Sequence, residues 1–345
     1  MTKRSSSLFA LALVGATTFA FQATAADTVT AVRVDKAPVL AAGATDPAWA
    51  KAEALSVALF GGVNFKDGKT TATIKAVYSG DTLYMLVQYD DPTQSVRRFP
   101  YQKQADGSWK KLVDPKDKGG DDNVYYEDKF ALIWNIGNSI KGFGQQGCMV
   151  ACHMGEAGKP FGNKYLPSEG ELGDIWHMKS IRTGYIGQVD DQFLDHTRYD
   201  KEKSPDAGRK SDPKTAGGYA DIKLVNGKPE FMHRSAIAAN AAGGTYYLRE
   251  EDKVPFDDSK FKAGDEVASI LVAPFTGDRG DIPVAIVWAD GKWTAVLSRK
   301  LVTGSKFDVQ FDNLGGTYEF GIAAFDNAQV RHAMHIGALK LQFAK

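Results

Sequence analysis

The sequence predicts a mainly β protein, folded as a β-sandwich with a few short helices. Many short segments rich in β-branched and aromatic residues are separated by turn signals such as Ser79-Gly80-Asp81 and Asp290-Gly291, a pattern typical of sandwiches and barrels. Few segments show a sustained helical period. The chain has 345 residues, of which 43% are hydrophobic, and this composition excludes a disordered chain.

Residues 1–25 are predicted to form a secretory signal peptide that is cleaved from the mature chain. Lys3 and Arg4 precede an apolar run at residues 8–21, and small residues follow at 23–26, the order typical of such peptides. The run is too short to cross a bilayer, which needs ~20 apolar residues. We therefore expect an exported, periplasmic protein, with one mature domain at residues 26–345 and no later membrane span.

The elements of the mature chain are predicted in the following order. A short helix is expected at residues 46–52, with Asp46 or Thr45 as its cap and Pro47 in its first turn. Residues 71–78 and 83–89 form a hairpin about the first turn signal, and residues 130–136 suit a strand buried on both faces. Residues 283–289 and 293–298 form a second hairpin, and residues 317–325 and 339–343 form late strands.

Two stretches interrupt this strand pattern. Residues 137–187 are rich in glycine and contain both cysteines of the chain, whereas residues 200–218 are polar and are expected to form a solvated surface loop. Long loops inside a compact domain are uncommon unless they have a function. The glycine-rich stretch is therefore predicted to contain the functional site.

The two cysteines carry the strongest chemical signal. Cys148 and Cys152 are followed directly by His153. Covalent haem attachment uses Cys-x-x-Cys-His, in which both thiols bind the haem and the histidine becomes the proximal iron ligand. Three residues separate the cysteines here instead of two, but the Cys-His step is intact, so we expect one haem c. The alternative is a small disulfide or a reduced pair; zinc would need two further ligands.

A distal iron ligand in an electron carrier is usually a histidine or a methionine. His332, Met334 and His335 lie together just before the last predicted strand, and this density favours their segment over isolated histidines. His177 is a further candidate. If residues 332–335 are extended, Met334 points to the same side as His332.

Four segments together resemble a known family. They are Thr45-Asp46-Pro47-Ala48-Trp49, the cysteine segment, Asp174-Ile175-Trp176-His177-Met178-Lys179, and Phe325-Asp326-Asn327 followed by Arg331-His332-Ala333. In this order they resemble the haem-binding domain of the ethylbenzene dehydrogenase gamma-subunit family, in its cytochrome c-552-like branch. The resemblance implies an immunoglobulin-like β-sandwich with haem-binding loops at one end.

The resemblance also implies roles for individual residues. Where gamma subunits bind haem b through a Met-Gly segment and a late Lys-Ala segment, this chain has Cys152-His153-Met154-Gly155 and His332-Ala333. This correspondence makes His153 the proximal ligand and His332 the distal one, with Met334, His335 and His177 as alternatives. Trp176 would then form a wall of the haem pocket and Lys179 would contact a haem propionate. A core position is an equally good interpretation of Trp176, because large aromatic residues are mostly buried.

These features together predict an electron-transfer protein that is not itself an enzyme: an exported monohaem c-type cytochrome with redox proteins as partners. The resemblance implies a periplasmic molybdenum oxidoreductase or terminal reductase as such a partner, and a free shuttle fits equally. The 42 basic and 42 acidic residues give no basic excess for nucleic-acid binding. Two alternatives remain: a haem sensor or enzyme with an open sixth site, and a haem-free carbohydrate- or ligand-binding module. The start at Asp46-Pro47-Ala48-Trp49 also resembles family 9 carbohydrate-binding modules, which would expose a tryptophan platform.

Overall fold

The computed structural model describes residues 27–117, 120–151, 165–198, 202–203, 210–211 and 217–344. The expected signal peptide, the Cys152-His153 step and most of the polar stretch at 200–218 lie outside the described residues. Among those that are described, no helix is long and apolar enough to span a membrane.

Thirteen strands form one large, mostly antiparallel sheet. Along the sheet the order is β10-β9-β8-β7-β21-β22-β2-β3-β4-β20-β19, and β1 and β23 pair with each other and link β3 to β21. The strands are β1 (Thr28–Arg33), β2 (Leu55–Phe60), β3 (Lys69–Ser79), β4 (Thr82–Asp90), β7 (Lys129–Asn135), β8 (Gly173–Lys179), β9 (Asp190–Leu194), β10 (Lys210–Ser211), β19 (Val284–Ala289), β20 (Lys292–Lys300), β21 (Thr317–Phe325), β22 (Ala333–Met334) and β23 (Leu339–Phe343).

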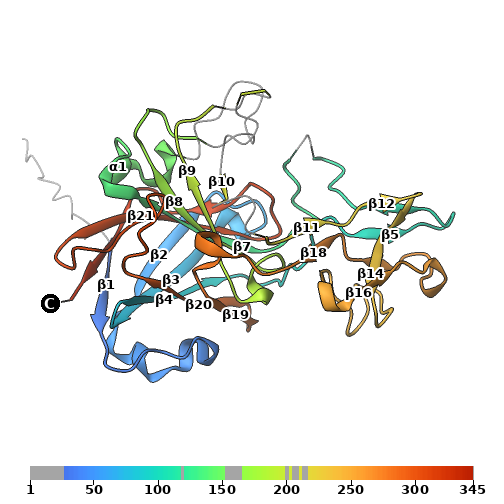
Figure 1. Cartoon of the computed structure of the whole chain (residues 1–345), viewed down its shortest axis with the longest axis horizontal. Helices are drawn as coiled ribbons and strands as arrows, with labels where there is room; N and C mark the ends of the chain where they lie inside the picture. The colour runs from blue at the N-terminus through green and yellow to red at the C-terminus, as the bar shows by residue number, and fades with distance from the viewer. Residues whose placement is uncertain are drawn as a thin grey trace, which may run out of the picture.

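The sheet folds back on itself so that its two halves enclose the main core (Figure 1). Trp134 of β7 and Trp176 of β8 come from one half, and Met85 of β4 and Trp293 of β20 come from the other; all four belong to one buried apolar cluster. Because alternate residues of a strand point to opposite faces, each half can bury one face in this way. The predicted mainly β sandwich is therefore confirmed.

The expected strands are present in the described part of the chain. The two hairpins are β3–β4, with Ser79 opposite Thr82, and β19–β20, with Ala289 opposite Lys292. β7 is buried on both faces, as its apolar run predicted, and β21 and β23 are the late strands. The short helix is a 3-10 helix, η2 (Pro47–Lys51), and it is capped by the Asp46 carboxylate, which accepts the Ala48 N–H at 2.9 Å.

The other helical segments are one to two turns long. They are η1 (Leu40–Thr45), η3 (Lys66–Gly68), η4 (Ile136–Asn138), α1 (Phe143–Gln146), η5 (Gly147–Val150), η6 (Gly184–Ile186), η7 (Glu250–Asp252), η8 (Asp258–Lys260) and η9 (Gly277–Gly280). Of these, α1 leads directly into η5, and η5 contains Cys148.

A smaller lobe of short strands lies beside the sandwich, at the right of Figure 1. Its own buried cluster includes Trp109, Met232 and Phe261. Its strands are β5 (Tyr101–Lys103), β6 (Trp109–Lys111), β11 (Ala220–Asp221), β12 (Leu224–Val225), β13 (Lys228–Pro229), β14 (Phe231–His233), β15 (Leu248–Arg249), β16 (Lys253–Pro255), β17 (Glu266–Val267) and β18 (Ile270–Val272). Strands of two or three residues are too short to show an alternation of apolar and polar residues. The sequence therefore predicted none of them.

One expectation about the glycine-rich stretch was wrong. Residues 137–187 were expected to interrupt the strands, but β8 lies inside them and pairs with β7 on one side and β9 on the other. All seven residues of β8 are buried. Three of them, Asp174, His177 and Lys179, are polar, and this composition hid the strand.

Candidate functional site

The candidate site lies on the face of β7, β8 and β21 that points away from the main core. Trp176 and Met178 of β8 enter the core, so Ile175 and His177 point to the other face. There a second apolar cluster forms on Ile133 and Ile175. Its further buried members are Ile140, Phe143, Cys148, Ala151, Leu166, Leu194 and Ala338. The glycine-rich segment and the C-terminal segment thus cover one apolar sheet face together.

Cys148 is buried on this face, and it contacts a residue far away in the sequence. Its Sγ lies 3.8 Å from Sδ of Met334. Beneath it is Gly321 of β21, where a Cβ atom would come within 3.3 Å of the Cys148 Cβ. Gly147 packs directly on the backbone of Gly337. The first predicted haem-attachment residue is therefore held against the segment that carries the predicted distal ligands.

His332 lies at the start of that segment, on the same face as Met334. Its ring contacts the Phe325 ring with centroids 4.7 Å apart, and its Nδ1 lies 2.8 Å from the Val330 carbonyl oxygen. A carbonyl only accepts hydrogen bonds, so Nδ1 carries the proton and Nε2 carries the lone pair in the neutral ring. Histidines that bind metals are oriented by such a bond to the second nitrogen.

The Phe325 ring also contacts a second histidine. The ring of His177 stacks on it at 5.9 Å, and Nδ1 of His177 lies 3.2 Å from Oε1 of Gln192. His177, Phe325 and His332 therefore form a row of rings across the face. The remaining candidate, His335, has Nδ1 at 3.3 Å from the Gly337 carbonyl oxygen.

Trp176 lies on the opposite side of the sheet from Cys148. It is fully buried in the main core, where its ring packs against Trp134 at 4.9 Å and its Nε1 donates to the Asp174 carboxylate at 3.0 Å. This is the position of a core aromatic, the interpretation that the sequence left open beside a pocket wall.

Lys179 is also fully buried, and it forms an ion pair with Asp190. Arg279 donates to the other oxygen of the same carboxylate at 2.7 Å. Burial opposes ionisation of Asp190, but Lys179 and Arg279 together hold its pKa below the ordinary value. In the structure, Lys179 thus has a carboxylate partner from the protein itself.

Several residues of this face were not found from the sequence. Two small residues of β21 are Gly321, which packs against Cys148, and Ala323, which lies opposite Met334. Ile140, Phe143 and Leu166 belong to the cluster that covers this face. The alternation of β21 was a usable signal for the first two. Nothing in the sequence could show that Phe325 stands between two histidines.

The chemistry of these side chains fits haem. A thiol, a thioether and an imidazole with its lone pair on Nε2 converge on an apolar face, and these are the groups that attach and ligate haem in c-type cytochromes. Cys152 and His153 follow Cys148 closely in the chain but lie outside the described residues.

Comparison with known proteins gives one family. The family described as ethylbenzene dehydrogenase matches residues 46–336, well over half of the chain. No curated protein matches the sequence. The chain is also similar to two solved structures of a family 9 carbohydrate-binding module from Caldicellulosiruptor kristjanssonii. The complex with glucose has 9% identity and a TM-score of 0.31, covering 91% of this chain and 94% of that chain. The complex with cellotriose has 9% identity and a TM-score of 0.33, covering 92% and 95%.

Proposed function

The chain belongs to the ethylbenzene dehydrogenase family, and from this premise we propose that it is a monohaem c-type cytochrome that transfers electrons. One observation supports the proposal most: Cys148 lies against Met334, next to His332, although the two segments are 186 residues apart. A haem attached at Cys148 would therefore meet a distal ligand from residues 332–335 without a large rearrangement.

Each residue of the site would have a separate role in binding the haem. Cys148 and Cys152 would bind the haem covalently, His153 would be the proximal ligand and His332 the distal one. The haem supplies the redox change between ferric and ferrous iron. The chain's own residues orient the ligand and exclude water: the Val330 carbonyl holds the His332 tautomer, and the apolar side chains around Ile133 and Ile175 keep the site dry. An apolar environment and the choice of axial ligand both tune the potential.

The protein would work outside the cytoplasm and with redox partners. The basic start, short apolar run and small residues of positions 1–26 support export to the periplasm. Such a carrier needs no substrate chemistry of its own, so we propose an electron-transfer role, either as a subunit beside a molybdenum oxidoreductase or terminal reductase or as a free shuttle. A pull-down from the native periplasm under reducing and oxidising conditions distinguishes the subunit from the shuttle.

The first test is covalent attachment. The purified full chain is denatured and extracted with acidified solvent; we expect the haem to stay with the polypeptide and a pyridine haemochrome assay to give one haem per chain. Replacing both Cys148 and Cys152 by alanine should leave little mature holoprotein, whereas His196→Ala, outside the site, should have none of this effect. Extraction of the colour from the wild-type chain contradicts the proposal.

The second test is the distal ligand. His332→Ala, His335→Ala and Met334→Ala are compared as ferric holoproteins at neutral pH. We expect only His332→Ala to lose the low-spin spectrum. If Met334 were the ligand, the wild type would show the weak near-infrared band of methionine ligation and a higher potential. A high-spin wild type would instead indicate an open sixth site, as in a sensor or enzyme.

The burial of the tryptophans argues against the haem-free binding module. Such a module would expose a tryptophan platform, but five of the six tryptophans are at most 4% exposed. The sixth, Trp288, is half-buried and donates its Nε1–H to the Asp91 carbonyl at 2.9 Å.

A further inference from the structure

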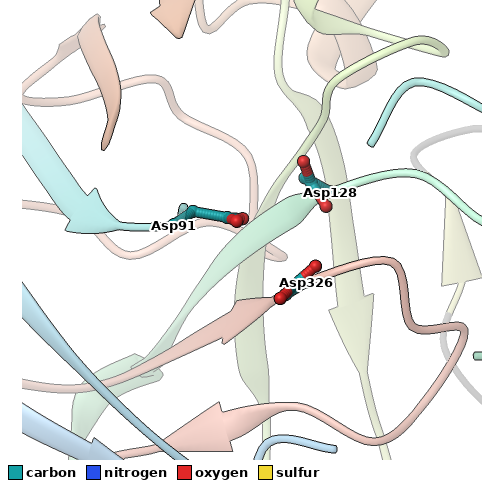
Figure 2. A group of neighbouring side chains, drawn as sticks. All are labelled: Asp91, Asp128 and Asp326. Atoms are coloured by element: carbon teal, nitrogen blue, oxygen red, sulfur yellow. The ribbon is translucent and has the colours of Figure 1, made fainter. Parts of the chain in front are cut away.

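Three aspartates meet at one end of the sandwich, away from the cysteine segment. Asp91 directly follows β4, Asp128 directly precedes β7 and Asp326 directly follows β21. Phe325 pairs with Lys129 in the sheet, which places Asp326 and Asp128 side by side, whereas Asp91 comes from the other half of the sandwich. Figure 2 shows the three carboxylates pointing toward one another, and one oxygen of each lies within 4.8 Å of the others.

The three carboxylates are buried, and no cationic side chain that the structure describes forms an ion pair with them. Asp91 and Asp128 are fully buried and Asp326 is 4% exposed, and no ion pair between described residues includes any of them. Burial, together with the charge of Asp326, raises the pKa of Asp91 to about 7, and burial and the charge of Asp91 raise the pKa of Asp128. A buried charge costs several kcal/mol unless it is paired, and the described part of the chain supplies no positive partner for this cluster.

Hydrogen bonds nevertheless hold Asp128 in the orientation of a charged group. Its carboxylate accepts the Ser95 N–H at 2.6 Å, the Asn327 N–H at 2.8 Å and the Trp293 Nε1–H at 3.1 Å. Donors of this kind favour the ionised form. A carboxylate that is held for ionisation, beside two others, is the arrangement expected of a cation ligand.

Two polar atoms at the cluster have no partner among the described residues. One is Oδ2 of Asp91, and the other is the hydroxyl of Tyr89. Tyr89 is 1% exposed and lies opposite Trp293 in the sheet, and the Trp293 ring donates to Asp128. Burial raises the pKa of Tyr89, and the charges of the three aspartates raise it further. Buried polar atoms are almost always bonded to protein, water or an ion, and a hydrated cation in the cluster would satisfy both.

We propose that Asp91, Asp128 and Asp326 bind a Ca²⁺ ion that joins the two halves of the sandwich. The donors are all oxygens, with no thiol or imidazole, and this set selects hard cations. Ca²⁺ lies 2.3–2.6 Å from its ligands, so oxygens on its opposite sides are about 5 Å apart, and one ion reaches all three carboxylates. Tyr89 and water molecules would complete the six to eight oxygen ligands that Ca²⁺ takes.

A second buried trio shows what a cluster with its own cation looks like. Asp174, Asp191 and Asp308 also bring carboxylate oxygens within 4.8 Å. There the Arg299 guanidinium lies 2.9 Å from Asp308 and 3.8 Å from Asp174, fully buried with them. The protein supplies the positive charge in this trio, and a metal ion would have to supply it in the other.

An open cleft lies next to the site. Ser95 and Asn327, whose backbone N–H groups bind Asp128, also line an open cleft of about 580 Å³. Only the residues that donate to Asp128 therefore separate its carboxylate from this cleft.

The test is a Ca²⁺ titration of the chelator-treated full chain by thermal unfolding and calorimetry, with Tb³⁺ as an optical probe. Trp293 bonds directly to Asp128, so Tb³⁺ at this site should emit when tryptophan is excited, and Ca²⁺ should abolish the emission. We expect Ca²⁺ to raise the unfolding temperature, and Asp326→Asn and Asp91→Asn to weaken binding at least tenfold. Asp191→Asn removes a carboxylate from the trio that contains Arg299 and should leave Ca²⁺ binding unchanged.

Three results would overturn the proposal. They are the absence of any heat, stabilisation or Tb³⁺ emission in the wild type, an equal loss of binding in Asp191→Asn and Asp326→Asn, and a clear preference for Mg²⁺ over Ca²⁺. The wild-type emission needs no variant, so the proposal can be refuted even if both substitutions at the triad prevent folding.

Discussion

Replacing Gly147 by alanine should separate the cysteine segment from the C-terminal segment. Gly147 has φ +56° and ψ −141°, a conformation that is almost restricted to glycine and costs about 1–3 kcal/mol for other residues. A Cβ at this position would also lie 2.6 Å from the carbonyl carbon of Gly337 and closer still to its oxygen. Backbone atoms cannot move aside by a change of rotamer, so this overlap adds about 1–3 kcal/mol.

Together these effects predict a loss of ~2–6 kcal/mol in the free energy of unfolding. For a chain of 345 residues each kcal/mol lowers the unfolding temperature by about 1.5 °C. Gly137→Ala is the matched control, because Gly137 also has a left-handed backbone, with φ +57° and ψ 22°, but nothing lies within 4 Å of its Cβ position. The control should cost only about 1 kcal/mol.

Urea unfolding followed by far-ultraviolet circular dichroism measures the difference between the two variants. In the holoprotein, Gly147→Ala should also increase the high-spin fraction of ferric haem, because the clash moves residues 332–337 relative to Cys148. Equal unfolding free energies for the two variants would show that the packing of Gly147 on Gly337 does not hold the site together.

Three further outcomes follow from the buried groups of β8. Trp176→Ala should cost about 3–5 kcal/mol in unfolding free energy but leave the visible haem spectrum unchanged, because the ring lies in the main core. An altered spectrum would indicate that Trp176 forms a wall of the haem pocket. Lys179→Met leaves Arg279 on Asp190 and should cost about 3 kcal/mol, since breaking a buried pair typically costs 3–5; no loss in urea unfolding would refute this. Burial, opposed by Arg299, raises the pKa of Asp174 to about 7. The folded state therefore keeps a proton that the unfolded chain loses near pH 4, and this carboxyl alone should lower the unfolding free energy by ~2 kcal/mol between about pH 5.5 and pH 8. Asp174→Asn should reduce the fall by that amount, and an unchanged slope would show that Asp174 does not titrate in this range.

Local patterns predicted those parts of the fold that local physics determines. The β3–β4 hairpin follows from apolar residues flanking a turn, with Gly80 at φ +59° where the chain reverses. The Asp46 cap follows from a side chain and an N–H two residues apart. Neither element depends on anything distant in the sequence.

Strand β8 is an element that local sequence patterns do not predict. Its polar side chains are stable in a buried strand because distant residues satisfy them: Asp174 accepts the Val309 N–H at 2.9 Å, and Lys179 pairs with Asp190. Without those partners the same segment would be a poor strand. These partners are distant in the sequence, so no local pattern predicts a buried strand at residues 173–179.

The candidate site was predictable in its chemistry but not in its assembly. The cysteine spacing and the family resemblance named Cys148 and His332, and the alternation of an extended chain placed Met334 on the same side as His332. The contact between Cys148 and Met334 needed the fold. No sequence pattern indicated the aspartate triad. Its members lie at the ends of three strands, and only the sheet topology brings these strand ends together.

The segment that carries His332 is held in place by the protein itself. It leaves β21 at Asp326, and polar contacts then hold it at intervals up to His332. These contacts join the Asn327 N–H to Asp128 at 2.8 Å, the Gln329 N–H to the Asp122 carbonyl at 2.7 Å, and Arg331 to the Asp121 carboxylate at 2.5 Å. A ligand on such a segment does not have to be ordered when haem binds, so less conformational entropy is lost on binding. The first of these contacts is made by a member of the aspartate triad. A cation there would neutralise the cluster that anchors the segment, and the triad would stabilise the distal ligand from the far end of the same loop.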